Sequence, residues 1–256
     1  MTTAWSPGRL GNLTGKRIIV TGATNGVGLG TARLLARAGA HVIMAVRNTE
    51  LGAQRAAAIG GSTSIAKLDL ADLSSVRAFP DQLDGDVDIL INNAGAVVQH
   101  RTDTVDGFEM TMGTNFLGPF ALTNLLLGRV RSQIINVGSD AHKSAKLRLD
   151  DMHLRSHRWA AYPAYARSKL AVMLWGLELD RRLRVAQSRV TTQLTHPGWV
   201  SSNLSHVSDT PVMAGFHRVV GVLANRFGND IEEGAAPTLY CAKTGSLLIP
   251  SMWVMG

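Results

Sequence analysis

Short apolar runs alternate with longer segments of helical periodicity along the whole chain. The runs, rich in Val and Ile, lie at residues 17–22, 41–46, 63–69, 87–92, 132–138 and 189–198. Helical spacing of apolar residues marks the segments 27–38, 49–58, 72–83, 103–128, 162–186 and 231–243. Continuous apolar runs are typical of parallel strands buried on both faces, which need helical crossovers. The pattern predicts an α/β fold, a Rossmann-type doubly wound parallel sheet, as a single domain over residues 1–256.

A glycine-rich stretch, TGATNGVGLG at residues 21–30, directly follows the first apolar run. Glycine destabilises a helix or strand interior by about 0.5–1 kcal/mol relative to alanine, so this density needs a backbone reason. Ligands of doubly wound sheets bind outside the carboxyl ends of the strands, where a pyrophosphate would lie at a helix N-terminus. We expect Gly22, Gly26 and Gly28 to form that turn and to allow close backbone approach, although a plain structural turn also fits.

Composition narrows the class of protein. The single cysteine, Cys241, excludes an internal disulfide and a cysteine-rich metal site. No run of 18 or more apolar residues occurs, and the N-terminus lacks an apolar signal region, which favours a cytoplasmic protein without a membrane span. The formal charge is +7, but the basic residues are dispersed. We expect solvated basic faces and no nucleic-acid surface, with a positive field that favours an anionic cofactor.

Six motifs in chain order carry a family resemblance. They are TG-x-x-x-G-x-G at 21–28, NNAG at 92–95, an Asn in MGTNFLGPF, a Ser in INVGSD, YARSK at 165–169 and HPGWVSSN at 196–203. One such motif alone is weak, but here the order and the context of all six agree. The chain resembles the short-chain dehydrogenase/reductase family over nearly its whole length, and looks most like its carbonyl reductase and retinol dehydrogenase branch.

The resemblance implies an oxidoreductase that moves a hydride between the nicotinamide of NAD(P) and a carbonyl or alcohol substrate. Tyr165 would be the general acid/base, and Ser139 would hydrogen-bond the reacting oxygen. Lys169 would lower the pKa of Tyr165 and bind the nicotinamide ribose. Asn115 would hold a water that leads protons away from Lys169. Tyr162 has no lysine four residues later, so it would only line the substrate pocket.

The tyrosine and the lysine of YARSK also fit this chemistry on physical grounds. Residues four apart share one face of a helix, so Tyr165 and Lys169 would be neighbours. A free tyrosine has a pKa of about 10. A cation about 4 Å away at an effective dielectric of 20 stabilises tyrosinate by about 4 kcal/mol at most. We therefore expect the pKa of Tyr165 near working pH, where general acid–base catalysis is efficient.

The resemblance also implies a cofactor site. It comprises Thr21, Gly22, Thr24, Asn25, Gly26, Val27, Gly28, Arg47, Asp69, Leu70, Asn93, Ala94, Gly95, Lys169, Pro197, Gly198, Val200 and Ser202. Asp69 would border the adenine ring, with a helix N-cap as the structural alternative. NAD-specific members commonly place an acid after the second strand, whereas this chain has Arg47, which can pair with a 2′-phosphate. We expect NADP, with NAD as the alternative, and no metal.

One departure from the family concerns the segment between Ser139 and Tyr165, which is longer than in many members. We expect residues 140–161 to be an insertion over the substrate, and residues 1–16 to be an N-terminal arm. Two other functions stay open. A non-catalytic dinucleotide-binding regulatory protein would be expected to lose its catalytic residues, and a sugar-nucleotide epimerase or dehydratase needs a larger C-terminal substrate domain. A homodimer and a homotetramer both fit.

Overall fold

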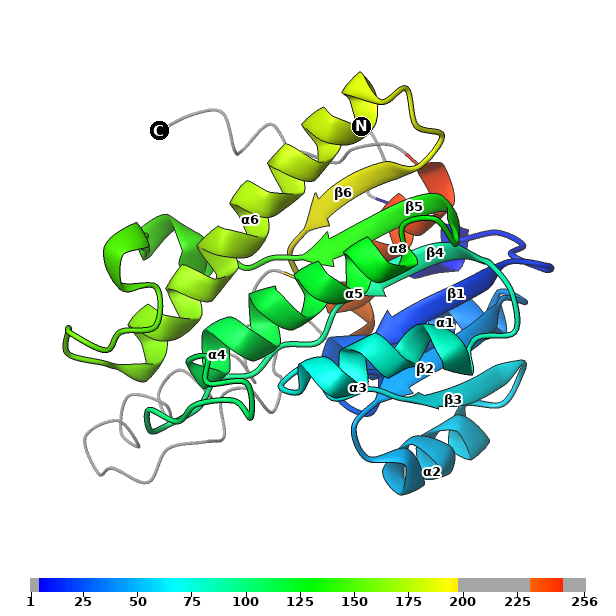
Figure 1. The fold of residues 1–256 in the computed structure, drawn as a ribbon. Helices are drawn as coiled ribbons and strands as arrows, with labels where there is room; N and C mark the ends of the chain where they lie inside the picture. Colours follow the sequence, from blue (N-terminus) through cyan, green and yellow to red (C-terminus); the bar gives the residue numbers. More distant parts are fainter. Residues whose placement is uncertain (1–4, 198–230, 246–256) are drawn as a thin grey trace.

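The computed structural model describes residues 5–197 and 231–245, which build on one parallel sheet (Figure 1). Its strands are β1 (Arg17–Thr21), β2 (His41–Val46), β3 (Thr63–Lys67), β4 (Val87–Asn92), β5 (Val130–Val137) and β6 (Thr191–Thr195). Their order is β3-β2-β1-β4-β5-β6, so the direction of winding reverses between β1 and β4. The expected Rossmann-type doubly wound sheet is confirmed, and its ligand crevice is expected beside the ends of these two strands.

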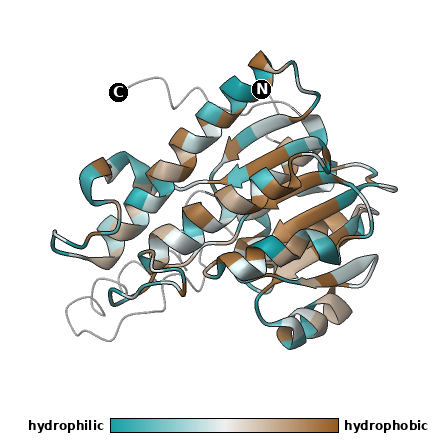
Figure 2. Ribbon diagram, viewed as in Figure 1, coloured by the Kyte–Doolittle hydropathy of each residue, from teal (hydrophilic) through white to brown (hydrophobic). Residues whose placement is uncertain are grey.

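Helices cover both faces of the sheet. On one face lie α1 (Gly26–Arg37), α2 (Thr49–Ile59) and α8 (Ile231–Thr244), and on the other lie α3 (Leu73–Ala78), α5 (Gly118–Leu126) and α6 (Ala161–Val185) (Figure 1). Alternate strand residues supply the two cores: Ile18 and Val20 pack toward α1 and α8, whereas Ile19 packs toward α5 and α6. Figure 2 shows the strands as the most hydrophobic part of the molecule. Burial of each such side chain contributes about 1.5–3 kcal/mol to the free energy of folding, relative to leaving it exposed.

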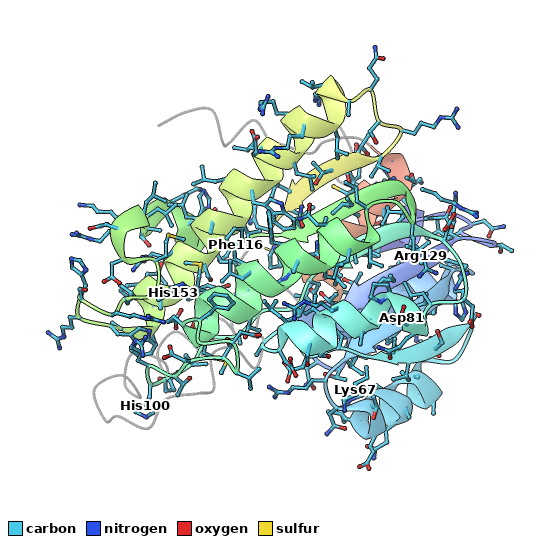
Figure 3. The ribbon with its side chains drawn as sticks, in the orientation of Figure 1. Lys67, Asp81, His100, Phe116, Arg129 and His153 are labelled. Carbon is cyan, nitrogen blue, oxygen red and sulfur yellow. The ribbon has the colours of Figure 1, made fainter. Side chains whose placement is uncertain are left out.

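Aromatic rings join α5 to α6. The ring centroid of Phe116, a residue labelled in Figure 3, lies 6.2 Å from that of Trp175 on α6. Phe120 on α5 lies 5.9 Å from Phe116 and 5.8 Å from Trp175. This contact fixes the position of α6 relative to the sheet, and α6 carries the YARSK motif.

Two helices are shorter than the sequence pattern predicts. The helix expected over 103–128 begins only at α4 (Met110–Met112) and continues through a π-helix (Gly113–Leu117) into α5. Gly107 has φ of +80° and turns the chain back, so that Asp103 and Glu109 pair as an antiparallel bridge. The helix expected over 72–83 ends at Ala78, because Pro80 lacks an N–H, and a 3₁₀ turn (Phe79–Gln82) follows.

The first described residues pack against α8. The rings of Trp5 and Tyr240 meet edge to face with centroids 5.6 Å apart. Lys243 donates a hydrogen bond to the carbonyl of Arg9, in the 3₁₀ turn Pro7–Arg9. The described part of the predicted N-terminal arm is therefore packed on the core. Across residues 5–197 and 231–245, no helix has the length and apolar character that crossing a membrane requires.

Candidate functional site

The ends of β1 and β4 are tied together by Thr21 and Asn93. Thr21 Oγ1 accepts hydrogen bonds from the backbone N–H groups of Asn93 and Ala94, both at 3.0 Å. The side-chain amide of Asn93 donates to the carbonyl of Thr21 at 2.9 Å. Gly22 has φ of +68°, and a Cβ there would lie 2.9 Å from the Cα of Ala94. The glycine is therefore required by both conformation and space, and it brings the two loops into contact.

The glycine-rich loop opens into the N-terminus of α1. The N-cap residue, Asn25, is exposed and makes no side-chain capping bond, and the first turn holds no acidic residue. Thr24 and Val27 are half-buried in the same loop, and Gly26 has φ of +53°. A Cβ on Gly28 would lie only 2.5 Å from the carbonyl of Gly22. An uncapped helix N-terminus at this edge suits an anionic group.

Two predicted cofactor residues follow the neighbouring strands β2 and β3. Arg47 comes directly after β2, is exposed, and makes no hydrogen bond or ion pair with any residue that the structure describes. Asp69 lies beyond β3, where its carboxylate accepts from the N–H of Ala71 at 2.9 Å. The cap of α3 is Asp72, so the alternative interpretation of Asp69 as a helix N-cap is wrong. Leu70 beside it is buried in the core.

The catalytic candidates converge where β4 and β5 end. Ser139 lies just beyond β5, and its hydroxyl is close enough to the phenol of Tyr165 on α6 to lower the pKa of that group. The ammonium of Lys169 donates to the carbonyl of Val137 at 2.9 Å and lies 5.8 Å from the centroid of the Tyr165 ring. A Cβ on Gly95, after β4, would lie 3.5 Å from that ammonium. The structure thus brings the serine, tyrosine and lysine together.

The electrostatics of this group differ from the sequence expectation. Burial raises the pKa of Tyr165, and the nearby hydroxyl of Ser139 opposes that shift only in part. Burial also lowers the pKa of Lys169 to about 8. The expected lowering of the tyrosine pKa is therefore wrong for this arrangement, because desolvation of the phenolate is the largest influence on the group. Tyr165 keeps its proton at neutral pH.

Asn115 occupies the π-helix and is almost fully buried. Its amide nitrogen donates to the carbonyl of Ala96 at 2.9 Å and to Ser168 Oγ at 3.0 Å. Ser168 in turn donates to the carbonyl of Tyr165 at 2.7 Å. The side-chain oxygen of Asn115 accepts from the N–H of Ala96 at 2.7 Å, so every polar atom of this side chain has a partner within the protein. The water expected at Asn115 stays a prediction. Sequence reasoning missed Ser168, although its spacing from Tyr165 places both on one helix face.

Tyr162 lies at the rim of this group. Its side chain is 54% exposed, and its hydroxyl accepts a hydrogen bond from Ser144 in the insertion at 3.3 Å. His142, also in the insertion, is 2.6 Å through Nδ1 from the carbonyl of Ser139. This placement agrees with a role on the substrate side.

The loop after β6 is described only at its start. Pro197 is half-buried, and His196 Nδ1 lies 3.7 Å from the carboxylate of Asp140 beside Ser139. Burial lowers the pKa of His196. The other predicted cofactor residues of this loop lie outside the described residues; they are Gly198, Val200 and Ser202.

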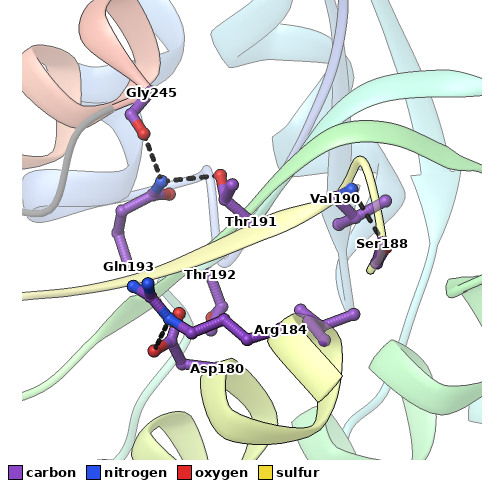
Figure 4. A pocket seen from close by; sticks show the side chains of 9 residues that line it. Asp180, Arg184, Ser188, Val190, Thr191, Thr192, Gln193 and Gly245 are labelled. Carbon is purple, nitrogen blue, oxygen red and sulfur yellow. Dashed lines mark hydrogen bonds and ion pairs between the residues drawn. The ribbon is translucent and has the colours of Figure 1, made fainter. Parts of the chain in front are cut away.

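A cavity of about 170 Å³ lies elsewhere, beside the first residues of β6 (Figure 4). Thr191, Gln193 and Gly245 line one part of it, and Asp180 and Arg184 of α6 line another. Parallel strands place their starts and their ends at opposite edges of the sheet, so this cavity is remote from Tyr165 and Lys169. It is not the cofactor crevice.

Comparisons with known proteins agree with the geometry. The family model for short chain dehydrogenases matches residues 16–211. Human retinol dehydrogenase 13 is 42% identical over 202 residues, which are 74% of this chain and 60% of that protein. Human retinol dehydrogenase 11 is 39% identical over 251 residues, 93% of this chain and 76% of that protein. A solved structure of an uncharacterized protein from Mycobacterium paratuberculosis has 41% identity and a TM-score of 0.80, covering 94% of this chain and 81% of that one.

Proposed function

The chain belongs to the short-chain dehydrogenase family, and on that basis we propose that it is an NAD(P)-dependent oxidoreductase that interconverts a carbonyl compound and its alcohol. One observation carries the proposal: the hydroxyls of Ser139 and Tyr165 lie close together beside the buried ammonium of Lys169, at the carboxyl edge of the sheet. A proton donor, a hydroxyl that orients an oxygen and a fixed cation are the groups that reduction of a carbonyl requires.

The residues at the switch point fit a nicotinamide dinucleotide. The uncapped N-terminus of α1 would receive the pyrophosphate, since Asn25 makes no capping bond and no acid opposes an anion there. Arg47, exposed at the end of β2, would hold the 2′-phosphate of NADP. Asp69 and the Asn93–Gly95 loop border the same edge. When bound, the nicotinamide supplies or accepts the hydride.

The proposed proton donor is Tyr165. Burial raises its pKa, so the phenol holds its proton at neutral pH. Transfer of that proton to a carbonyl oxygen would then depend on the nearby charge of Lys169. Ser139 orients that oxygen through its hydroxyl. Lys169 carries its charge below a pH of about 8 and stabilises the phenolate left behind after the transfer.

The substrate side is proposed to lie under the insertion, where Tyr162 and His142 stand next to Ser139. The two curated relatives are named for retinol, a primary alcohol on an apolar chain. Apolar aldehydes and their primary alcohols are therefore the first substrates to test.

The test is a panel of apolar and polar carbonyl compounds with NADPH and with NADH, followed by cofactor oxidation and by mass spectrometry of the product. We expect oxidation of NADPH coupled one to one to formation of an alcohol. A protein that binds the cofactor but reduces no member of the panel, and oxidises none of the matching alcohols, would support a regulatory role instead. Conversion of a sugar nucleotide without net cofactor consumption would indicate an epimerase.

A further inference from the structure

Arg167, two residues after Tyr165, is a buried guanidinium with an incomplete set of partners. Its side chain is 5% exposed. Nη2 donates to the carbonyl of Asp151 in the insertion at 2.7 Å, whereas Nε and Nη1 make no hydrogen bond to any described residue. A guanidinium stays charged at every physiological pH, so this cation must be balanced by charges around it.

Carboxylates on two other elements provide that balance. Glu109, before α4, and both Asp150 and Asp151 of the 3₁₀ turn Leu149–Asp151 attract the guanidinium, while Arg148 opposes them. Glu109 is 1% exposed. Glu109, Asp151 and Arg167 are buried and thus form a group of opposite charges that joins the start of α4, the insertion and α6, whereas Arg148 and Asp150 are exposed.

Asp151 organises the middle of the insertion. Its carboxylate accepts from the N–H of Arg155 at 2.8 Å, from the N–H of Ser156 at 3.0 Å and from Nδ1 of His157 at 2.7 Å. The carbonyl of the same residue receives Arg167. Arg167 on α6 therefore binds the residue, Asp151, whose carboxylate holds this turn together.

Glu109 holds the end of the insertion. Its carboxylate caps α4 and accepts from the indole N–H of Trp159 at 3.2 Å, and its own N–H donates to Nδ1 of His153 at 3.3 Å. The ring of His153, labelled in Figure 3, stacks on Phe108 with centroids 5.4 Å apart. The insertion is therefore fastened at its middle and near its end through polar contacts.

One face of α6 carries the catalytic candidates, and the opposite face contacts the insertion. At 3.6 residues per turn, Arg167 points roughly 160–200° away from Tyr165 and Lys169, so it lies on the opposite face of the helix. The insertion begins next to Ser139 and ends just before Tyr165. The conformation of the insertion can therefore influence the relative position of the Ser139 and Tyr165 side chains.

We propose that Arg167 is a positioning residue that clamps the insertion onto α6 and thereby determines which substrates fit beside Ser139 and Tyr165. The catalytic part of this inference rests on the proposed function, whereas the clamp itself does not. Arg167 touches neither reacting group and acts only through the insertion. Its loss would alter substrate recognition more than the chemical step.

The experiment compares Arg167→Met with Arg167→Lys, which keeps the charge and one donor. In hydrogen exchange without substrate, we expect Arg167→Met to speed exchange of residues 149–159 by about tenfold or more, with the sheet unchanged. In steady-state kinetics we expect KM to rise by about fivefold or more, with a changed ranking of substrates and kcat within about threefold. The dissociation constant of NADPH should stay the same. Arg167→Lys should recover part of both effects.

The matched control is Arg182→Met, which removes the same charge from the same helix at an exposed ion pair with Glu178. It should change neither readout. If Arg167→Met fails to fold, Arg167→Lys carries the test, since it keeps the charge but loses the planar array of donors that reaches the carbonyl of Asp151. Unchanged exchange at 149–159 in the folded variants would overturn the clamp. Faster exchange with unchanged KM and substrate ranking would overturn its role in selectivity. Absence of reductase activity in the wild type would count against the proposed function alone, because exchange would still report on the clamp.

Discussion

Asn115 holds the backbone of Ala96 from both sides. Its side-chain oxygen accepts from the N–H of Ala96 at 2.7 Å, and its amide nitrogen donates to the carbonyl of the same residue at 2.9 Å. Through Ser168 it also reaches the carbonyl of Tyr165. The loop after β4 and the catalytic turn of α6 are thereby joined by hydrogen bonds that are buried or part-buried, so the loss of one partner leaves a polar group poorly satisfied.

Replacing Asn115 by Leu should therefore destabilise the protein strongly. The variant keeps the branched shape but leaves both polar groups of Ala96 without their partner, which costs about 2–4 kcal/mol in the free energy of unfolding. Urea denaturation of both proteins measures this loss. The control is Asn124→Leu, because Asn124 is exposed and bonds only to the carbonyl of Phe120. A similar loss of stability in both variants would show that the hydrogen bonds from Asn115 to Ala96 contribute no more than an exposed one.

The exchange of Tyr165 for Phe should abolish most of the activity and little else. The change removes the hydroxyl that we propose as proton donor, so turnover should fall by about a hundredfold or more while NADPH affinity is kept. Stopped assays of product, with cofactor titration, separate the two effects. Tyr162→Phe is the matched control, since the hydroxyl of Tyr162 forms its hydrogen bond among the described residues with Ser144. Retention of more than about a tenth of wild-type turnover by Tyr165→Phe would refute the assignment.

Lys169 should make stability depend on pH in the alkaline range. Its pKa is lowered from 10.5 to about 8 in the folded protein, so between these values the unfolded chain binds more protons. Stability must then rise as pH rises from about 8 to 10.5, and the cost of burying the charge, about 3 kcal/mol, is fully present below pH 8. Lys169→Met should flatten this rise while losing activity. Urea denaturation at pH 7 and at pH 10 compares the two proteins.

The same shift predicts a loss of activity above pH 8. The ammonium beside Tyr165 loses its proton there, and with it the charge that stabilises the phenolate. We expect kcat for carbonyl reduction to fall as pH rises through about 8, where the pKa of Lys169 lies. A profile that stays flat up to pH 10, in a protein that remains folded, would contradict this role.

Gly22 should not tolerate alanine. Its φ of +68° disfavours any side chain, and the added Cβ would meet the backbone of Ala94. Since both loops of the switch point would have to move, we expect weaker NADPH binding together with a lower melting temperature. Gly60 also has positive φ, at +70°, but open space around it, so Gly60→Ala is a control for backbone strain alone. Equal NADPH affinities in the two variants would show that contact with Ala94 does not matter.

The sequence predicts well those parts of the fold that are determined by neighbouring residues in the chain. The strands appear within a few residues of the expected bounds, because buried parallel strands need continuous apolar runs. The glycine loop and the convergence of Ser139, Tyr165 and Lys169 follow from motifs whose spacing places them at strand ends or on one helix face. The late start of the helix at Met110 was missed, because the turn at Gly107 depends on pairing between Asp103 and Glu109.

The electrostatics of the site were not predictable from spacing. Burial is the largest influence on the pKa of Tyr165, and burial depends on the tertiary packing around the phenol rather than on residue spacing. The role of Arg167 was hidden for a similar reason. Only the folded insertion brings the carbonyl of Asp151 to this side chain, and no pattern in YARSK indicates that contact.

Arg47 offers the sharpest test of the cofactor. It follows β2 at the edge where the adenosine ribose is expected, is exposed, and has no partner among the described residues, so it is available to a phosphate that NAD lacks. A charge-assisted hydrogen bond contributes about 1.5–3 kcal/mol, and Arg presents several donors in one plane. We expect NADP(H) to bind about tenfold to a thousandfold more tightly than NAD(H).

Arg47→Asp should reverse or abolish that preference, because the carboxylate repels the phosphate and accepts from a ribose hydroxyl. Arg55→Asp makes the same change of charge at an exposed position on α2 and should leave the ratio unchanged. Calorimetric titration of both cofactors into the three proteins decides the matter: equal affinities in the wild type, or an equal shift in both variants, would refute a direct role of Arg47 while leaving the oxidoreductase intact.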